Sequence, residues 1–152
     1  MMCAPRLLVA CVAAGLLAGC EGYALRGKVV DGAASQISVV SPDDARLKSI
    51  GVPQATVQVT VDPDRLDRKV LPPQLVADDG SFSVPIRQTG AGVLEYSVMV
   101  VVRRGGYDSA AVTMRLPGGG KRLLVTLVRG PDHYKPTDDP LRDSQEFLRE
   151  FR

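Results

Sequence analysis

The stretch 55–61, Ala-Thr-Val-Gln-Val-Thr-Val, decides the fold class of this chain. Apolar and polar residues alternate strictly along it, so Val57, Val59 and Val61 fall on one face of an extended strand. Residues 94–102 repeat the alternation and end in a continuous apolar run, which predicts the most central strand. We therefore expect a β protein in which these two segments carry much of the core.

Further short strands are expected on both sides of these two segments. Residues 81–86 alternate as well, and Pro85 belongs at a sheet edge or a strand end because proline has no N–H to donate. Several short strands at regular spacing predict an all-β sandwich or barrel. The other candidates are 25–30, 36–40, 74–77, and the pair 110–116 and 122–129, joined by a turn at 117–120.

The N-terminal residues 1–19 have the pattern of an export signal. An uncharged run, 7–18, follows Arg6. It is shorter than the roughly 20 residues that cross a hydrocarbon core, and its length suits a secretory signal. The run ends in Leu17-Ala18-Gly19-Cys20, which resembles the lipobox of bacterial lipoproteins.

This resemblance implies cleavage before Cys20 and lipidation of its thiol, so that residues 20–22 form a lipidated N-terminus. The alternative is an ordinary signal peptide with an accidental cysteine. Cys3 and Cys11 lie in the signal, so the mature chain has no cysteine pair for a disulfide. Because Glu21 and not Asp follows the cysteine, the rule for such lipoproteins favours the outer membrane, facing the periplasm, over the inner membrane.

Residues 23–129 are expected to form one domain, and residues 130–152 an extended linker with a possible short helix after Asp139. Pro140 would be the first helical residue. Basic and acidic side chains nearly balance over the chain, with 19 Lys and Arg against 17 Asp and Glu. This balance gives no strong field that would attract nucleic acid or anionic lipid.

An ordered set of motifs resembles the carboxypeptidase regulatory-like domains, which are prealbumin-like sandwiches. Residues 25–31 (LRGKVVD) look like the first strand of that family, and 51–57 (GVPQATV) resemble the approach to its second strand. Residues 79–82 (DGSF) match its turn and strand, and Gly106-Tyr107 its Gly-Tyr pair; residues 123–127 fit the closing strand.

The resemblance implies a seven-stranded Greek-key sandwich whose matched residues have structural roles. Gly80 would serve the turn, Phe82 the core, and Tyr107 would be a packed ring with a solvated hydroxyl. Gly51, Pro53 and Gly106 complete the set of fold-determining residues. The roughly twenty residues between Val30 and Gly51 exceed the usual connection of the family, and the tail after Gly130 lies outside its pattern.

No motif for catalysis, a metal or a cofactor stands out. His133 is the only histidine and lies in the linker, no G-x-S-x-G is present, and the Tyr-Arg-Gly-Ser ending of transthyretin-like hydrolases is absent. The loop aspartates, which could hold calcium, are expected to serve turns and caps. They are Asp62, Asp64, Asp67, Asp78 and Asp79.

Two basic pairs, Arg103-Arg104 and Lys121-Arg122, either form a patch across a hairpin end or are solvated separately. Residues 118–121 (GGGK) lack the spacing of a phosphate loop and favour a turn.

The sequence thus favours a membrane-anchored, non-catalytic envelope lipoprotein whose sandwich docks on an envelope protein. The alternative is a glycan-binding or small-ligand-binding module, and a distant third is a secretion-system lipoprotein. No enzyme, cofactor or nucleic acid partner is expected.

Overall fold

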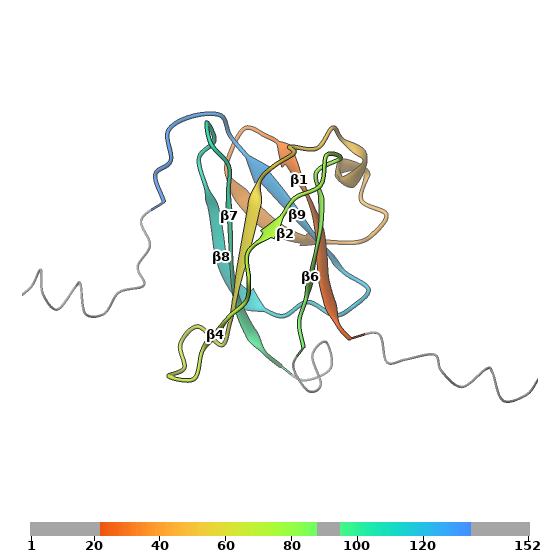
Figure 1. Ribbon diagram of the computed structural model, residues 1–152. Helices are drawn as coiled ribbons and strands as arrows, with labels where there is room; N and C mark the ends of the chain where they lie inside the picture. The colour runs from red at the N-terminus through yellow and green to blue at the C-terminus, as the bar shows by residue number, and fades with distance from the viewer. Residues whose placement is uncertain (1–21, 88–94, 135–152) are drawn as a thin grey trace, which may run out of the picture.

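The computed structural model describes residues 22–87 and 95–134 of the chain. The export signal with Cys20 and the helix expected after Asp139 lie outside these residues. Within the described part, nine strands form two sheets, and the single helical element is the 3-10 turn η1 (Ala45–Lys48). The expected all-β class is confirmed, and Figure 1 shows the arrangement of the elements.

The first sheet joins strands from both ends of the domain. In spatial order it contains β2 (Gln36–Val40), β9 (Arg122–Leu127), β1 (Ala24–Asp31) and β6 (Ser81–Pro85). β1 and β9 run parallel, whereas the β1–β6 and β2–β9 pairs are antiparallel. Pro85 ends an edge strand, as expected from its missing donor.

The second sheet contains β3 (Thr56–Val61), β7 (Ser97–Arg103) and β8 (Ala110–Arg115), with two short strands, β4 (Lys69–Val70) and β5 (Gln74–Leu75), on the outer side of β3. All of its pairs are antiparallel. β7 pairs on both sides, so the prediction that 94–102 holds an interior strand is confirmed. It begins at Ser97.

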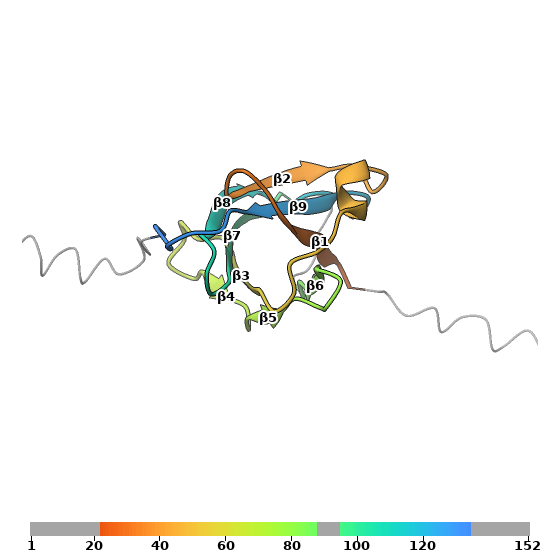
Figure 2. The ribbon, with the colours of Figure 1, turned by 90° about the horizontal axis from the view of Figure 1, so that it is seen from above.

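One main core fills the space between the two layers, which Figure 2 shows from above. Val57, Val59 and Val100 of the second sheet are fully buried, and so are Val29 and Leu123 of the first. The alternation in 55–61 therefore has its expected effect, because its valines face the other sheet and its polar residues face outward.

The count of nine strands differs from the seven that the family resemblance implies. Two of the nine are only two residues long: β5, which falls in the expected segment 74–77, and β4, which was not predicted. They lie on either side of Pro72-Pro73, and because proline has no N–H, these residues cannot continue a ladder of backbone hydrogen bonds. The segment therefore pairs with β3 only in two short pieces.

The expected pairing of 110–116 with 122–129 is wrong. β8 lies at the edge of the second sheet, and β9 lies between β1 and β2 in the first, so residues 117–120 cross from one layer to the other. β9 carries the run Leu123-Leu124-Val125, whose members are all at most 2% exposed. Such a run needs cover on both faces, and only a position inside a covered sheet supplies it.

The long connection between Val30 and Gly51 provides that cover. Leu47 of η1 packs against Val30, Val40 and Leu124, which form a second, smaller core on the outer face of the first sheet. The turn is capped by Asp44, whose carboxylate accepts a hydrogen bond from the Arg46 N–H at 2.9 Å. The connection that is longer than in the family thus has its own packing role.

Candidate interaction surfaces

The fold-determining glycines meet where the chain crosses itself. Gly51 bridges to Val30, and a Cβ built on Gly51 would lie 2.0 Å from the Asp79 carbonyl oxygen and 2.5 Å from the Gly80 Cα. Gly80 has a φ of +83°, and its carbonyl accepts the Val29 N–H at 2.8 Å. Both positions thus require glycine, one for its close approach and the other for its backbone angle.

The turn after Gly51 places two buried residues. Pro53 and Gln54 form its centre, between Val52 and Ala55, which are 3% and 0% exposed. Gln54 has a φ of +60°, as the second central residue of a turn with proline at its first does in the type II geometry. Pro53 therefore has a turn role.

Phe82 lies opposite Gly27 in the β1–β6 ladder. Its side chain is 6% exposed, and a Cβ on Gly27 would lie 2.5 Å from the Phe82 Cζ. The ring occupies the space that the missing side chain of Gly27 leaves. The predicted core role of Phe82 agrees with this position.

Tyr107 anchors the end of the domain where β7 turns into β8. Gly106 precedes it with a φ of +80°, and the tyrosine ring is partly buried against the core. The guanidinium carbons of Arg104 and Arg129 lie 5.3 and 5.7 Å from the ring centroid, within cation–π range. Arg129 also forms an ion pair with Asp31 at 3.1 Å, so this end joins β1 to the segment after β9.

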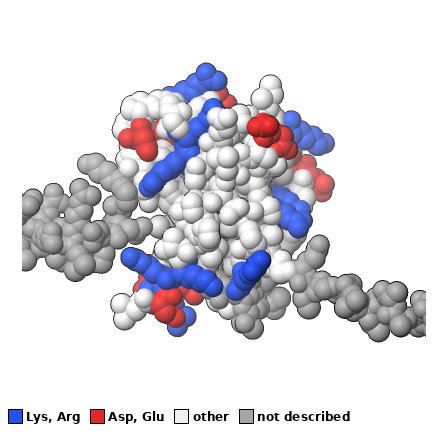
Figure 3. Space-filling view, viewed as in Figure 1, with Lys and Arg blue, Asp and Glu red and all other residues white. Residues whose placement is uncertain are grey.

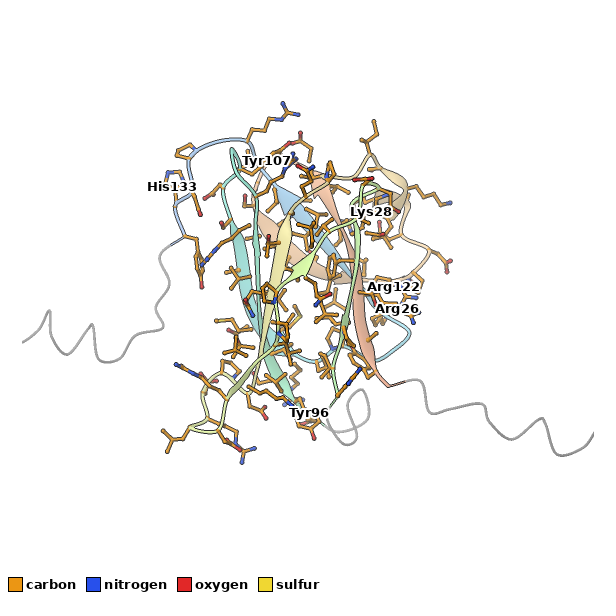
Figure 4. The ribbon with its side chains drawn as sticks, viewed as in Figure 1. Arg26, Lys28, Tyr96, Tyr107, Arg122 and His133 are labelled. Atoms are coloured by element: carbon orange, nitrogen blue, oxygen red, sulfur yellow. The ribbon has the colours of Figure 1, made fainter. Side chains whose placement is uncertain are left out.

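The first residues after Arg129 pack on the same end. The Gly130 N–H donates to the Gly106 carbonyl at 3.1 Å, and the His133 N–H donates to the Asp108 carboxylate at 2.8 Å. The His133 side chain is 75% exposed and its Nδ1 lies 3.3 Å from the same carboxylate. Figure 4 shows His133 beside the Tyr107 end of the molecule. Its exposure fits the expected solvated histidine.

Three of the five loop aspartates, Asp79, Asp62 and Asp67, have a hydrogen-bond or ion-pair partner. Asp79 accepts a hydrogen bond from the Ser81 N–H at 2.8 Å, and hydrogen bonding to Ser81 holds the pKa of this carboxyl below its usual value. Asp62 accepts from the Ser97 N–H at 3.3 Å, and Asp67 lies 3.6 Å from Arg65. Across residues 22–87 and 95–134, no three acidic, histidine or cysteine side chains are grouped as metal ligands.

The basic pairs do not form a patch across a hairpin. Arg103 ends β7 next to the start of β8, whereas Arg122 starts β9 beyond the other end of β8. The two pairs therefore lie at opposite ends of the molecule. This outcome follows from the crossing between layers that the sequence did not indicate.

A groove on the outer face of the second sheet was not predicted. It encloses about 290 Å³, and its floor includes Val101 and Thr60, which are only 4% and 6% exposed although they face away from the main core. At one end the Arg103 guanidinium stacks 4.6 Å from the centroid of the Tyr134 ring. The polar positions of 55–61 were the available signal, because they had to face outward together.

Three exposed apolar side chains lie in the segment beyond β3, and one of them, Val70, also lines this groove. They are Leu66 in the turn before β4, Val70 of β4 and Leu75 of β5, which are 108%, 60% and 70% exposed. In Figure 3 the centre of the face that is seen carries no Lys, Arg, Asp or Glu, and the charged side chains lie around it. We refer to Leu66, Val70 and Leu75 together as the apolar edge.

Comparisons with known proteins do not assign the chain to a class. No family model matches it, and neither a curated protein nor a solved structure matches it significantly. Among the residues that the structure describes, no helix is long and apolar enough to cross a membrane. The function must therefore be inferred from the surfaces themselves.

Proposed function

We propose that this chain is a lipid-anchored, non-catalytic lipoprotein of the bacterial cell envelope, and that its β-sandwich docks on an envelope protein through the apolar edge. The observation that carries the docking role is the exposure of Leu66, Val70 and Leu75. Large apolar side chains that remain in water on two edge strands and on the turn before them are typical of an interaction surface. The partner we infer presents an apolar surface of its own.

The family resemblance supports the same proposal. We infer a prealbumin-like Greek-key arrangement from the motifs at Gly51, Gly80 and Tyr107. In that family the module usually accompanies another activity. The short strands β4 and β5 limit strand addition at this edge, so side chains would supply most of the contact.

The anchor follows from the lipobox-like ending at Cys20, and Glu21 favours the outer membrane, facing the periplasm. β1 begins at Ala24, and four extended residues reach at most about 14 Å, so an acylated Cys20 would hold the sandwich close to the bilayer.

Cys20→Ala tests the anchor. Each buried CH₂ of an acyl chain contributes about 0.8 kcal/mol to membrane binding, so loss of the acyl chains should move most of the protein from the membrane fraction to the soluble one. Fractionation in cells and a mass measurement of Cys20 check this. Cys3→Ala is the matched control, and persistent tight association of Cys20→Ala with membranes would contradict the anchor.

The docking role is tested with a photo-crosslinking amino acid placed at single positions in cells. Probes at Val70 and Leu75 should capture the same envelope protein, and a probe at Thr113, on the outer face of β8, should not. Leu66→Ser with Leu75→Ser should lower the yield from position 70 several-fold, because apolar contact area is lost. Equal capture from all positions would refute docking at this edge.

The alternative, a glycan-binding or small-ligand-binding module, is favoured by one observation. The groove carries an aromatic ring, Tyr134, next to the Arg103 guanidinium and the polar side chain of Gln58. If the probes at the apolar edge capture nothing, binding of glycans and cell-wall fragments to this groove becomes the leading hypothesis.

A further inference from the structure

Three cationic side chains from two strands meet on the outer face of the first sheet. Along β1, Leu25 and Val29 point into the main core, so Arg26 and Lys28 point outward. On β9 the inward residue Leu123 leaves Arg122 on the same outer face. Figure 4 shows Arg26 and Arg122 close together, with Lys28 farther along β1.

The register makes two of these cations direct neighbours. β1 and β9 are parallel, and Gly27 pairs with Leu123, so Arg26 and Arg122 occupy the adjacent position at the start of the ladder. Like charges side by side on neighbouring strands are destabilising. The pair is therefore a cost to the free protein that an anionic ligand would remove.

The ion pairs of the described residues leave this cluster out. Within residues 22–87 and 95–134, none of the ion pairs involves Arg26, Lys28 or Arg122. The Arg122 guanidinium donates to the carbonyls of Gly119 and Lys121 through one nitrogen, at 3.3 and 2.9 Å. Its other guanidinium nitrogens have no hydrogen-bond acceptor in the part of the chain that the structure describes, so they can bind another acceptor.

Other groups around the cluster are compatible with an anion. Ser83 and Ser81 of β6 lie opposite Arg26 and Lys28, and with Arg122 they border an open hollow of about 510 Å³. Two acidic groups are affected by the cluster: Lys28 has a small effect on Asp79, whose carboxylate is held by Ser81, and Arg122 acts on the Tyr23 phenol. Two guanidinium groups with neighbouring hydroxyls suit the geometry of a phosphate group.

We propose that Arg26 and Arg122, assisted by Lys28, form a phosphate-binding site, and that its occupant is the headgroup of an anionic membrane lipid. A free phosphate would share the chemistry. The choice of the lipid rests on the proposed anchor, because an acylated Cys20 would hold β1 next to the headgroups. The site itself depends only on the register of β1 and β9.

The test uses the chain Glu21–Arg152, which carries no acyl group. All members of both cores lie between Leu25 and Leu127, so this chain retains the packing of the fold, and its far-ultraviolet circular dichroism checks this. Sedimentation with vesicles containing one third phosphatidylglycerol measures binding. Vesicles of phosphatidylcholine alone should not bind the protein.

Arg26→Gln with Arg122→Gln should weaken binding to the anionic vesicles by about 30-fold, since each cation near an anionic surface contributes about 1 kcal/mol. The matched control, Arg65→Gln with Arg68→Gln, has the same net charge and leaves the first sheet intact. The site variant should also unfold at an equal or higher urea concentration than the parent, because it lacks the like-charge pair. A purely structural role would give the opposite change in stability.

Two outcomes would overturn the proposal. If the site variant and the control bind anionic vesicles equally, the contact depends on net charge and no site exists at Arg26 and Arg122. If inorganic phosphate raises the unfolding midpoint of the parent but vesicles do not bind, the lipid is not the occupant. Neither outcome depends on the acyl anchor, so the anchor can fail or hold independently.

Discussion

Gly51→Ala should destabilise the domain by about 3 kcal/mol or more, enough to unfold a small domain of ordinary stability. The added Cβ would lie 2.0 Å from the Asp79 carbonyl oxygen and 2.4 Å from its carbonyl carbon. Both neighbours are backbone atoms, so no side chain can rotate away to make room. Relief would require the segment before β3 to separate from the turn before β6.

Such a separation would break the hydrogen bonds that hold the crossing. The Val52 N–H donates to the Val29 carbonyl and the Val29 N–H donates to the Gly80 carbonyl, both at 2.8 Å. Urea unfolding followed by circular dichroism measures the loss. Gly119→Ala is the matched control, because no atom lies within 4 Å of its added Cβ, and it should change the free energy of unfolding by less than about 0.5 kcal/mol. A loss below about 1 kcal/mol for Gly51→Ala would contradict the close approach.

Phe82→Ala should lower the free energy of unfolding by about 3–5 kcal/mol, the usual cost of truncating a buried aromatic side chain. The ring is 6% exposed and covers Gly27, which has no side chain to fill the space that Ala would leave. The cavity would therefore stay open between β1 and β6. Part of the loss would come from the edge strand, whose pairing with β1 the ring supports.

The same urea experiment measures this effect, with Leu75→Ala as the control. Leu75 is a large apolar residue of the other sheet that is 70% exposed, so its truncation should cost less than about 0.5 kcal/mol. Similar losses for the two variants would mean that Phe82 is not part of the core.

The strands themselves could be predicted because their signals are local. The alternation in 55–61 follows from the twofold repeat of a strand, and Pro85 could be placed at an edge because it lacks a donor. The turn glycines were recognised from motifs, and Gly80 and Gly106 have the positive φ that such turns require. None of these inferences needs knowledge of a partner strand.

The sheet that each strand joins was beyond the sequence. Residues 117–120 were expected to close a hairpin, yet they cross between the layers, because β9 needs cover on both faces and finds it in the first sheet, where the main core lies on one face and the smaller core on the other. That choice depends on residues far away, such as Leu47, which covers Leu124. A Pro-Gly-Gly-Gly segment such as 117–120 can either close a hairpin or connect the two sheets.

By itself, the sequence determined the all-β class, the inward valines, the turn glycines and the expectation of a lipid anchor at Cys20. Each depends on neighbours within a few residues. Only the tertiary structure decided the surfaces: the apolar edge, the groove beside Tyr134, and the meeting of Arg26 with Arg122. These residues lie far apart along the chain, and the parallel register of β1 and β9, set by burial on both faces of β9, brings the two arginines side by side.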